Sequence, residues 1–265
     1  MPTAEAIYEA LDRMAPFRLQ MDFDNAGFLV GDGKAEISRV LVALDITDQV
    51  IEEAAAWDAE LIVSHHPIIF HPVKVIRRED PVGRRLMALI ERHVGAICCH
   101  TNLDAVRGGV NDRLAQQAGL TDIGQLHQDG VDENGAPYGI GRVGTLKDGP
   151  MSMEDYLVQL KGALKPNGMR FCDAGRPVSR VAVGGGACAG MLKDALTAGC
   201  DTFVTSDVKY DGFLDAKAWG INLIDAGHFP TEDVICPQLV EFLRKTFPDL
   251  TVKKSECHHE VISYS

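Results

Sequence analysis

The sequence predicts an α/β protein of two α/β domains, with mostly parallel or mixed sheets sandwiched by helices. Two stretches, 39–118 and 180–247, each alternate short β-branched runs with helical segments of ten or more residues, which is the pattern of βαβ units. The strand candidates are almost continuously apolar, as strands covered on both faces are. A chain of 265 residues that is 46% hydrophobic can bury a sizeable core.

Both stretches follow the same order of strand and helix. In the first, the expected strands are 39–47, 60–64 and 96–101, and the expected helices are 48–57, 81–94 and about 109–118. In the second, the expected strands are 180–185, 201–206 and 221–226, and the expected helices are 188–199, 211–220 and 231–247. The shared plan indicates two domains of related architecture.

The segment between the two stretches has a different composition. Residues 127–178 are rich in glycine, with a pair of probable strands and one helix near 152–164. We therefore expect a first domain at 1–126 and a second at 127–265 that includes this β-rich insert. The prediction leaves open that the C-terminal segment packs back on the first domain.

Charge and hydropathy narrow the classes of partner. The net charge of −12 disfavours binding to nucleic acid or to anionic membranes, because both need clustered Lys and Arg. No run approaches the roughly 18 apolar residues of a membrane span, and the first residues are acidic, unlike a secretion signal. Seven cysteines, none in a C-x-x-C pair, argue against a disulfide framework. We expect a cytoplasmic protein.

Histidines and carboxylates follow three of the expected strands. In open parallel sheets, ligands bind beyond the carboxyl ends of the strands, so residues at those ends are the first candidates for chemistry. One pair of such residues lies at or after the end of each of three expected strands: the strand ending at Ser64, the strand at 96–101 and the strand at 221–226. These pairs are His65 with His66, His100 with Asp104, and His228 with Glu232.

This set of imidazoles and carboxylates predicts a metal site. Four or five such ligands exceed one closed tetrahedral site and suit two divalent ions that share a carboxylate bridge. Side chains alternate along a strand, and Pro67 ends the regular strand, so His65 and His66 can reach two different ions. Zn, Fe, Mn and Co all fit these ligands.

Several residues also have structural explanations. Asp104 could cap a turn, and Glu232 could favour a helix N-terminus. We expect surface roles for His71 and His93, and the C-terminal ECHHE (256–260) stands without a partner cluster. The glycine turn at 184–186 could cradle a phosphate, although tight packing of strand against helix explains it more simply.

Five motifs resemble those of the NGG-interacting-factor-three-like family of dinuclear-metal proteins, whose members are often labelled GTP cyclohydrolase 1 type 2 homologs. They are DFDNAGFLVGD (22–32), SHHPIIF (64–70), CHTNLDAVRGGVND (99–112), TSDVKYDGFLDA (205–216) and IDAGHFPTE (224–232). The resemblance covers essentially the whole chain. It departs at Ser206 and Asp211, where members often have Gly and His, so substrate contacts at that strand end are open.

The resemblance implies a metal pair in the cleft between the two domains and a ring-shaped homohexamer. Carried over to this sequence, the metal ligands are His65, His66, Asp104, His228 and Glu232, with Glu232 as the bridge. His100 and Asp104 are then the candidates for proton transfer in catalysis, and His100 could instead orient the ligands.

The function expected from these residues is that of a dinuclear metal-dependent hydrolase. By resemblance it is GTP cyclohydrolase 1 type 2-like, with a metal-activated water attacking GTP or another nucleotide. A nucleotide or phosphoester hydrolase would use the same residues. A protein of another class, a metal-binding ring that assembles or regulates partners without turnover, is the alternative.

Overall fold

The computed structural model describes residues 1–133 and 135–265. The chain folds into two compact units, and each is described by itself. The first unit contains residues 1–103 and 235–259, and the second contains residues 104–234 and 260–265.

The bounds of the units differ from the sequence-based division in two segments. Residues 104–126, assigned above to the first domain, belong to the second unit because strand β5 (Leu120–Gln125) pairs with strand β8 (Arg142–Leu146). Helix α10 (Cys236–Thr246) and strand β13 (Thr251–Lys254) belong to the first unit. Residues 235–259 therefore belong to the first unit, whereas residues 260–265 belong to the second.

Within the described residues, a five-stranded sheet of order β1-β4-β3-β2-β13 forms the centre of the first unit. β4, β3, β2 and β13 run parallel, and β1 is antiparallel to β4. In the register, Ser64 lies opposite both Ala43 and Cys98, so the three inner strands end level with one another. The remaining strands of the sheet are β1 (Gly27–Val30), β2 (Arg39–Ala43), β3 (Leu61–Ser64) and β4 (Gly95–Cys98).

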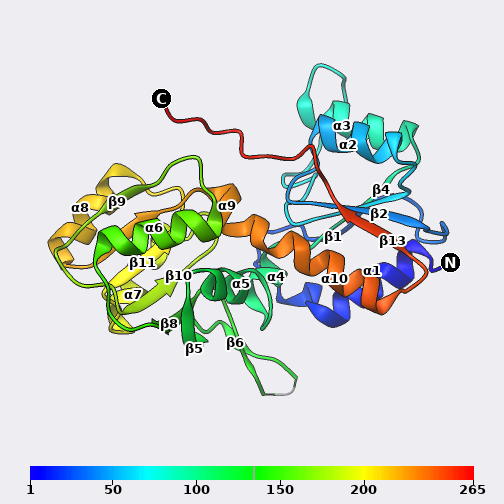
Figure 1. The fold of residues 1–265 in the computed structure, drawn as a ribbon. Coiled ribbons are helices and arrows are strands. Elements are labelled where there is room, and N and C mark those ends of the chain that lie inside the picture. The colour runs from blue at the N-terminus through cyan, green and yellow to red at the C-terminus, as the bar shows by residue number, and fades with distance from the viewer. Residues whose placement is uncertain (134) are drawn as a thin grey trace. The chain divides into compact units, whose positions relative to one another are not determined.

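Two layers of helices cover this sheet. Figure 1 shows α2 (Asp48–Ala56) and α3 (Pro81–Glu91) on one face, and α1 (Ala4–Met14) and α10 on the other. Side chains alternate along the strands, and Leu41 and Ile62 pack with the residues of α2 and α3. The Thr47 side chain caps α2 by accepting a hydrogen bond from the backbone N–H of Val50.

The second unit has a mixed six-stranded sheet of order β5-β8-β10-β11-β12-β9 within the described residues. β10, β11 and β12 are parallel, whereas β8 and β9 pair with them antiparallel. A short hairpin of β6 (Gly130–Val131) and β7 (Pro137–Tyr138) stands apart from this sheet. The other strands are β9 (Arg170–Cys172), β10 (Arg180–Val183), β11 (Thr202–Thr205) and β12 (Asn222–Asp225).

Helices cover both faces of this sheet as well. One hydrophobic cluster joins α5 and α6 to the sheet through residues that include Leu114, Tyr156 and Val204. The other joins α7 and α8 to it through residues that include Ala195, Phe203 and Ala216. These helices are α5 (Val110–Gln117), α6 (Met153–Leu164), α7 (Leu192–Thr197) and α8 (Tyr210–Trp219). The predicted class, α/β with mixed sheets flanked by helices, is confirmed.

Several predicted elements differ in their bounds, such as the expected strand at 39–47, which ends at Ala43, and two of them contain predicted site residues. The expected strand at 96–101 ends at Cys98, and helix α4 (Thr101–Ala105) begins three residues later. The expected helix at 231–247 is divided into α9 (His228–Glu232), a 3-10 turn at Asp233–Ile235 and α10. Pro237, in the first turn of α10, lacks the N–H that a continuous helix would need there.

None of the helices in residues 1–133 and 135–265 combines the length and hydropathy that crossing a membrane requires.

Candidate functional site

Three histidines of the first unit gather where β3 and β4 end. His65 and His66 follow β3 and extend its pairing with the β2 chain, since their backbone N–H groups donate to Ala43 and Leu44 carbonyls at 3.3 and 2.9 Å. His100 stands between β4 and α4. The His65 ring centroid is 5.0 Å from that of His66 and 5.2 Å from that of His100. We call these three residues the histidine cluster.

An oxygen atom holds Nδ1 of each histidine in the cluster. His65 Nδ1 lies 2.8 Å from the carbonyl oxygen of Cys99, and a carbonyl can only accept, so Nδ1 carries the proton. His66 Nδ1 lies 2.8 Å from Asp45 Oδ1, and His100 Nδ1 lies 2.7 Å from Asp24 Oδ1. In the neutral ring the lone pair is then on Nε2, and one ring nitrogen from each histidine lies within 4.8 Å of the other two.

The two aspartates that hold His66 and His100 are ionised near neutral pH. Burial raises the pKa of Asp24, but hydrogen bonds from His100 and Thr101 outweigh it and lower this pKa to about 2. Burial acts in the same way on Asp45, where hydrogen bonds from His258 and His66 lower the pKa well below its ordinary value. Both carboxylates therefore act as acceptors, which fixes Nδ1–H as the tautomer of both histidines.

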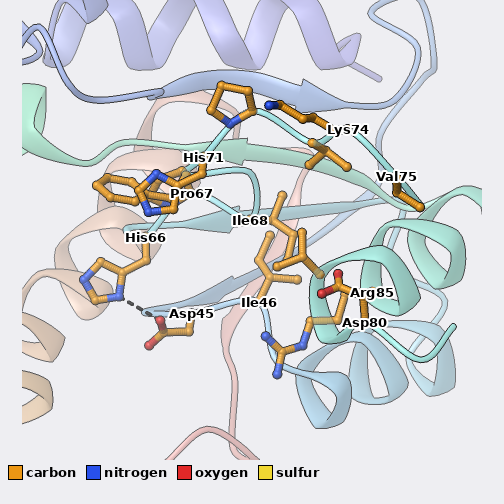
Figure 2. A pocket seen from close by; sticks show the side chains of 14 residues that line it. Asp45, Ile46, His66, Pro67, Ile68, His71, Lys74, Val75, Asp80 and Arg85 are labelled. Atoms are coloured by element: carbon orange, nitrogen blue, oxygen red, sulfur yellow. Dashed lines mark hydrogen bonds and ion pairs between the residues drawn. The ribbon is translucent and has the colours of Figure 1, made fainter. Parts of the chain in front are cut away.

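A pocket of about 390 Å³ opens beside His66, within the first unit (Figure 2). Its lining mixes apolar side chains such as Ile46 and Ile68 with the charged groups of Lys74 and Arg85. His71 also lines it, an exposed residue whose ring centroid lies 4.8 Å from that of Phe70. Asp45 and Asp80 line it as well, so the pocket offers apolar surface and charged groups of both signs next to one histidine of the cluster.

Two exposed aromatic rings extend this surface toward His100. Phe70 is 38% exposed, and its ring centroid lies 5.9 Å from that of His100. Phe23 is 63% exposed and packs edge-on against Phe70 at 6.3 Å. Exposed rings beside polar groups can stack on a flat heterocyclic ligand.

In the second unit, a histidine and two carboxylates lie close together. His228 opens α9, and its Nε2 is 2.9 Å from Oε2 of Glu232, one helical turn later. His228 Nδ1 is 2.7 Å from Oδ2 of Asp207, which follows β11. Glu232 is only 3% exposed. We call Asp207, His228 and Glu232 the Glu232 group.

The glycine turn after β10 makes room for the Glu232 group. A Cβ atom at Gly186 would lie 1.9 Å from Glu232 Oε1 and 3.3 Å from His228 Nε2, and Gly186 has a φ of +64°. The Gly186 backbone N–H also donates to Thr231 Oγ1 at 3.0 Å. Close packing of the turn on α9 therefore accounts for this glycine.

Asp104 is the first residue of the second unit and is 8% exposed. The amide of Asn111 donates to the Asp104 backbone carbonyl at 3.0 Å. The loop after Asp104 is fixed by the buried guanidinium of Arg142, which donates to the carbonyls of Ala105 and Val106 at 3.2 and 2.9 Å. Arg142 also bonds Asp112 at 2.8 Å, so its buried charge is paired.

The structure brings the predicted site residues together in two groups. His65, His66 and His100 meet in the first unit, and His228 meets Glu232 in the second. A single metal centre served by both groups, with Asp104 as a ligand, stays a prediction.

Sequence reasoning missed three residues that contact predicted site residues, and a fourth that contacts one of those three. Asp24 and Asp45 hold His100 and His66, Asp207 holds His228, and His258 bonds Asp45. Three of these residues could have been found from the sequence, because each follows a parallel strand. Asp45 follows β2, Asp207 follows β11, and His258 lies in the ECHHE segment after β13. Asp24 is far from any parallel strand end in the sequence, and only its motif DFDNAGFLVGD marked it.

The donor atoms fit a divalent metal ion. Histidine ligands in proteins almost always donate their second ring N–H to a carboxylate or carbonyl, as His65, His66, His100 and His228 do here. Neither candidate metal-holding group found in the described residues includes a cysteine, and burial raises the pKa of the Cys98 thiol to about 12. Imidazole with carboxylate suits Zn, Fe, Mn or Co.

The comparisons with known proteins agree with the motifs. A sequence profile of Duf34/NIF3 (NGG1p interacting factor 3) matches residues 2–260. A Clostridium perfringens protein named GTP cyclohydrolase 1 type 2 homolog is 34% identical over 227 residues, 85% of each chain. A Nostoc protein of the same name is 39% identical over 212 residues, 79% of this chain and 78% of its own.

Two solved structures have the same fold. A hypothetical protein of Staphylococcus aureus superposes with a TM-score of 0.91 at 28% identity and covers 100% of both chains. A Bacillus cereus protein related to NIF3 gives 0.93 at 22% identity, covering 100% of this chain and 99% of its own, and supports the fold alone. The resemblance read from the motifs is confirmed, and the chain belongs to the Duf34/NIF3 (NGG1p interacting factor 3) family.

Proposed function

We propose that this protein is a dinuclear metal-dependent hydrolase that acts on a nucleotide. The observation that carries the proposal is the common arrangement of four histidines. In each, Nδ1 lies 2.7 to 2.8 Å from an oxygen atom, which directs Nε2 toward the proposed site, where Nε2 of His228 also lies 2.9 Å from Glu232 Oε2. Four histidines arranged alike are typical of metal ligation rather than of ordinary core packing.

The proposed ligands are His65, His66, Asp104, His228 and Glu232. The histidine cluster alone and the Glu232 group alone each offer fewer ligands than two divalent ions take, so the proposal assigns both groups to the same pair of ions. When bound, these ions would supply the Lewis acidity that makes water a nucleophile near neutral pH.

The remaining polar residues have supporting roles in the proposal. His100, held through Nδ1 by Asp24, presents Nε2 as an acceptor and is the candidate to take a proton. The Asp24 carboxylate also accepts a hydrogen bond from the backbone N–H of Thr101 at 3.0 Å, which fixes the His100 ring relative to the start of α4. Asp45 and Asp207 orient His66 and His228 in the same way.

The pocket beside His66 is the proposed substrate site (Figure 2). Lys74 and Arg85 are the cationic groups of its lining that could contact phosphate, beside the carboxylates of Asp45 and Asp80, and Arg85 also lies 3.6 Å from Asp48. Phe70 and Phe23 supply a flat apolar surface for a base. Together these features favour a nucleotide over a small uncharged substrate.

GTP is the first substrate to test, because two relatives bear the name GTP cyclohydrolase 1 type 2 homolog. In a GTP cyclohydrolase reaction one water adds at C8 of the guanine and opens the five-membered ring to a formamide, and a second water hydrolyses the formamide and releases formate. A nucleotide or phosphoester hydrolase using the same residues would release a base or phosphate instead.

The test combines metal content with turnover in matched variants. D104A and E232A, purified beside wild type, are assayed for bound metal by elemental analysis and for formate from GTP with Mn, Fe or Zn added. We expect both variants to lose metal and at least about 100-fold of the turnover, since losing a ligand costs no less than losing its hydrogen-bonded support. E154A, which removes an exposed carboxylate from α6, is the control and keeps both.

Two outcomes contradict the proposal. Unchanged turnover in D104A and E232A would exclude a metal-dependent mechanism at these residues. A wild-type protein that holds its metal tightly but hydrolyses neither GTP nor other nucleotides would favour the metal-binding assembly instead.

A further inference from the structure

The C-terminal tail places a buried histidine beside an aspartate that holds the histidine cluster. His258 is 8% exposed, and its Nε2 lies 2.9 Å from Oδ2 of Asp45. The other oxygen of the same carboxylate, Oδ1, lies 2.8 Å from Nδ1 of His66. One carboxylate thus joins two imidazoles, one through each oxygen. His258, Asp45 and His66 all belong to the first unit.

Strand topology explains why the tail reaches Asp45. β13 pairs in parallel with β2, so both strands end at the same edge of the sheet. The pairing continues past β13, because the backbone N–H of Ser255 donates to the Val42 carbonyl at 2.7 Å. Asp45 follows β2 by two residues and His258 follows β13 by four. Residues that follow adjacent parallel strands meet at one edge.

The segment directly before His258 is anchored. Glu53 of α2 accepts hydrogen bonds from the Ser255 hydroxyl and from the backbone N–H groups of Glu256 and Cys257, the latter two at 3.1 and 3.3 Å. Three consecutive residues are therefore held by one carboxylate. His258 reaches Asp45 from a fixed stretch of backbone, so little conformational entropy is lost when their hydrogen bond forms.

The hydrogen bond from His258 restrains Asp45 more than it would restrain a fully buried carboxylate, which its surroundings already hold. The Asp45 side chain is 41% exposed, so water competes for its oxygens and the carboxylate can turn about its last torsion. A second hydrogen bond to Oδ2 opposes that rotation. It keeps Oδ1 where it accepts Nδ1–H of His66, which in turn keeps the ring's lone pair on Nε2.

We propose that His258 is a positioning residue for His66: by holding Asp45 through Oδ2, it fixes the orientation and tautomer of the metal-ligating imidazole. The expected gain in metal affinity rests on the proposed metal function, whereas the orientation of His66 by His258 does not. The tail thereby contributes to the site without supplying a ligand.

The experiment uses three variants of the full chain and two measurements. H258F keeps a ring of similar volume and removes the donor. H258Q keeps an N–H donor the same number of bonds from the backbone. H259F changes the exposed neighbouring histidine and is the control. The first measurement is the tautomer of His66 in metal-free protein, from imidazole ¹⁵N NMR; the second is Zn²⁺ affinity from competition with a chromophoric chelator.

We expect wild type, H258Q and H259F to show the Nδ1–H tautomer of His66, and H258F to show a mixture of tautomers. Zn²⁺ affinity should fall about 10-fold in H258F, the lower end of the range for residues that support a ligand, and H258Q should regain most of it. If H258F does not fold, H258N, whose amide is one methylene too short, takes its place.

The outcomes separate this inference from the proposed function. A His66 tautomer in H258F identical to that of wild type would overturn the positioning role. An equal effect of H259F on either measurement would do the same. If wild type binds none of Zn²⁺, Fe²⁺, Mn²⁺ and Co²⁺, the proposed metal function fails, and the NMR measurement alone decides whether His258 orients His66.

Discussion

Gly186 is the residue whose replacement should disturb the Glu232 group most directly. It has a φ of +64°, and any side chain there would meet a carboxylate oxygen of Glu232. Two separate costs therefore act at this position, the strain of the left-handed backbone and the crowding of Glu232. The same glycine donates its backbone N–H to Thr231, so displacing it also disturbs α9.

We predict that G186A lowers both stability and metal content. The left-handed conformation costs about 1–3 kcal/mol for a residue with a side chain, and the added methyl group displaces Glu232. Chemical denaturation and elemental analysis measure the two effects.

Two glycines serve as controls for this prediction. Gly199 has a φ of +73°, and a methyl group added there would have nothing within 4 Å, so G199A isolates the backbone strain. Gly190 has neither feature, so G190A should behave as wild type. Metal content in G186A equal to that in G199A would contradict the crowding of Glu232.

At the scale of elements, the candidate site residues of the first unit follow the ends of its parallel strands. The carboxyl ends of β2, β3, β4 and β13 deliver Asp45, the pair His65 and His66, His100, and His258. The edge strand β13 is held in this arrangement partly by Glu53 of α2. Burial raises the pKa of Glu53, but hydrogen bonds from Ser255, Glu256, Lys253 and Cys257 outweigh it and lower the pKa below its ordinary value.

We predict that E53Q destabilises the protein at neutral pH and has a smaller effect in acid. A carboxyl group with a lowered folded-state pKa contributes stability above its unfolded pKa of about 4.3, and that stability is lost as pH falls through the folded value. E53Q should lose about 1–3 kcal/mol at pH 7, with the difference from wild type narrowing below about pH 4.

Denaturant unfolding at several pH values measures this difference. E52Q, which changes an exposed neighbour on the same helix, is the control and should track wild type throughout. A difference between E53Q and wild type that stays constant down to about pH 3, below the unfolded pKa, would contradict the assignment.

At the scale of the whole molecule, the second unit exposes apolar side chains near an open sheet edge. β9 is the last strand of its sheet, and Phe171 in it is 50% exposed. On α8, which packs against β9, Leu214 and Trp219 are 54% and 41% exposed. Exposed apolar groups beside an open sheet edge are typical of interfaces between subunits.

We propose the homohexamer that the family resemblance implies, and predict a solution mass of six times 28.8 kDa. Multi-angle light scattering coupled to size exclusion measures it. F171E, which places a charge on the edge strand, should lower the mass if β9 forms part of an interface. A wild-type mass of 28.8 kDa across the micromolar range would contradict the hexamer.

The parallel strands were predictable because each is a short apolar run that must be buried on both faces. The expected strand at 60–64 corresponds to β3 (Leu61–Ser64), and 221–226 corresponds to β12 (Asn222–Asp225). β13 (Thr251–Lys254) was not predicted, because three of the four residues in its sequence TVKK are polar and it becomes a strand through its pairing with β2. β1 (Gly27–Val30) is likewise defined by its antiparallel pairing with β4.

By itself, the sequence determined the α/β class and the nearness of His65 and His66 to His100, because hydrophobic periodicity identifies strands and parallel strands end at a common edge. Only the tertiary structure decided which residues hold those histidines. Asp24 reaches His100 across 76 residues of chain and His258 reaches Asp45 across 213, and no local pattern records contacts of that separation. Such contacts depend on strand order and register, which are set by packing of the whole unit.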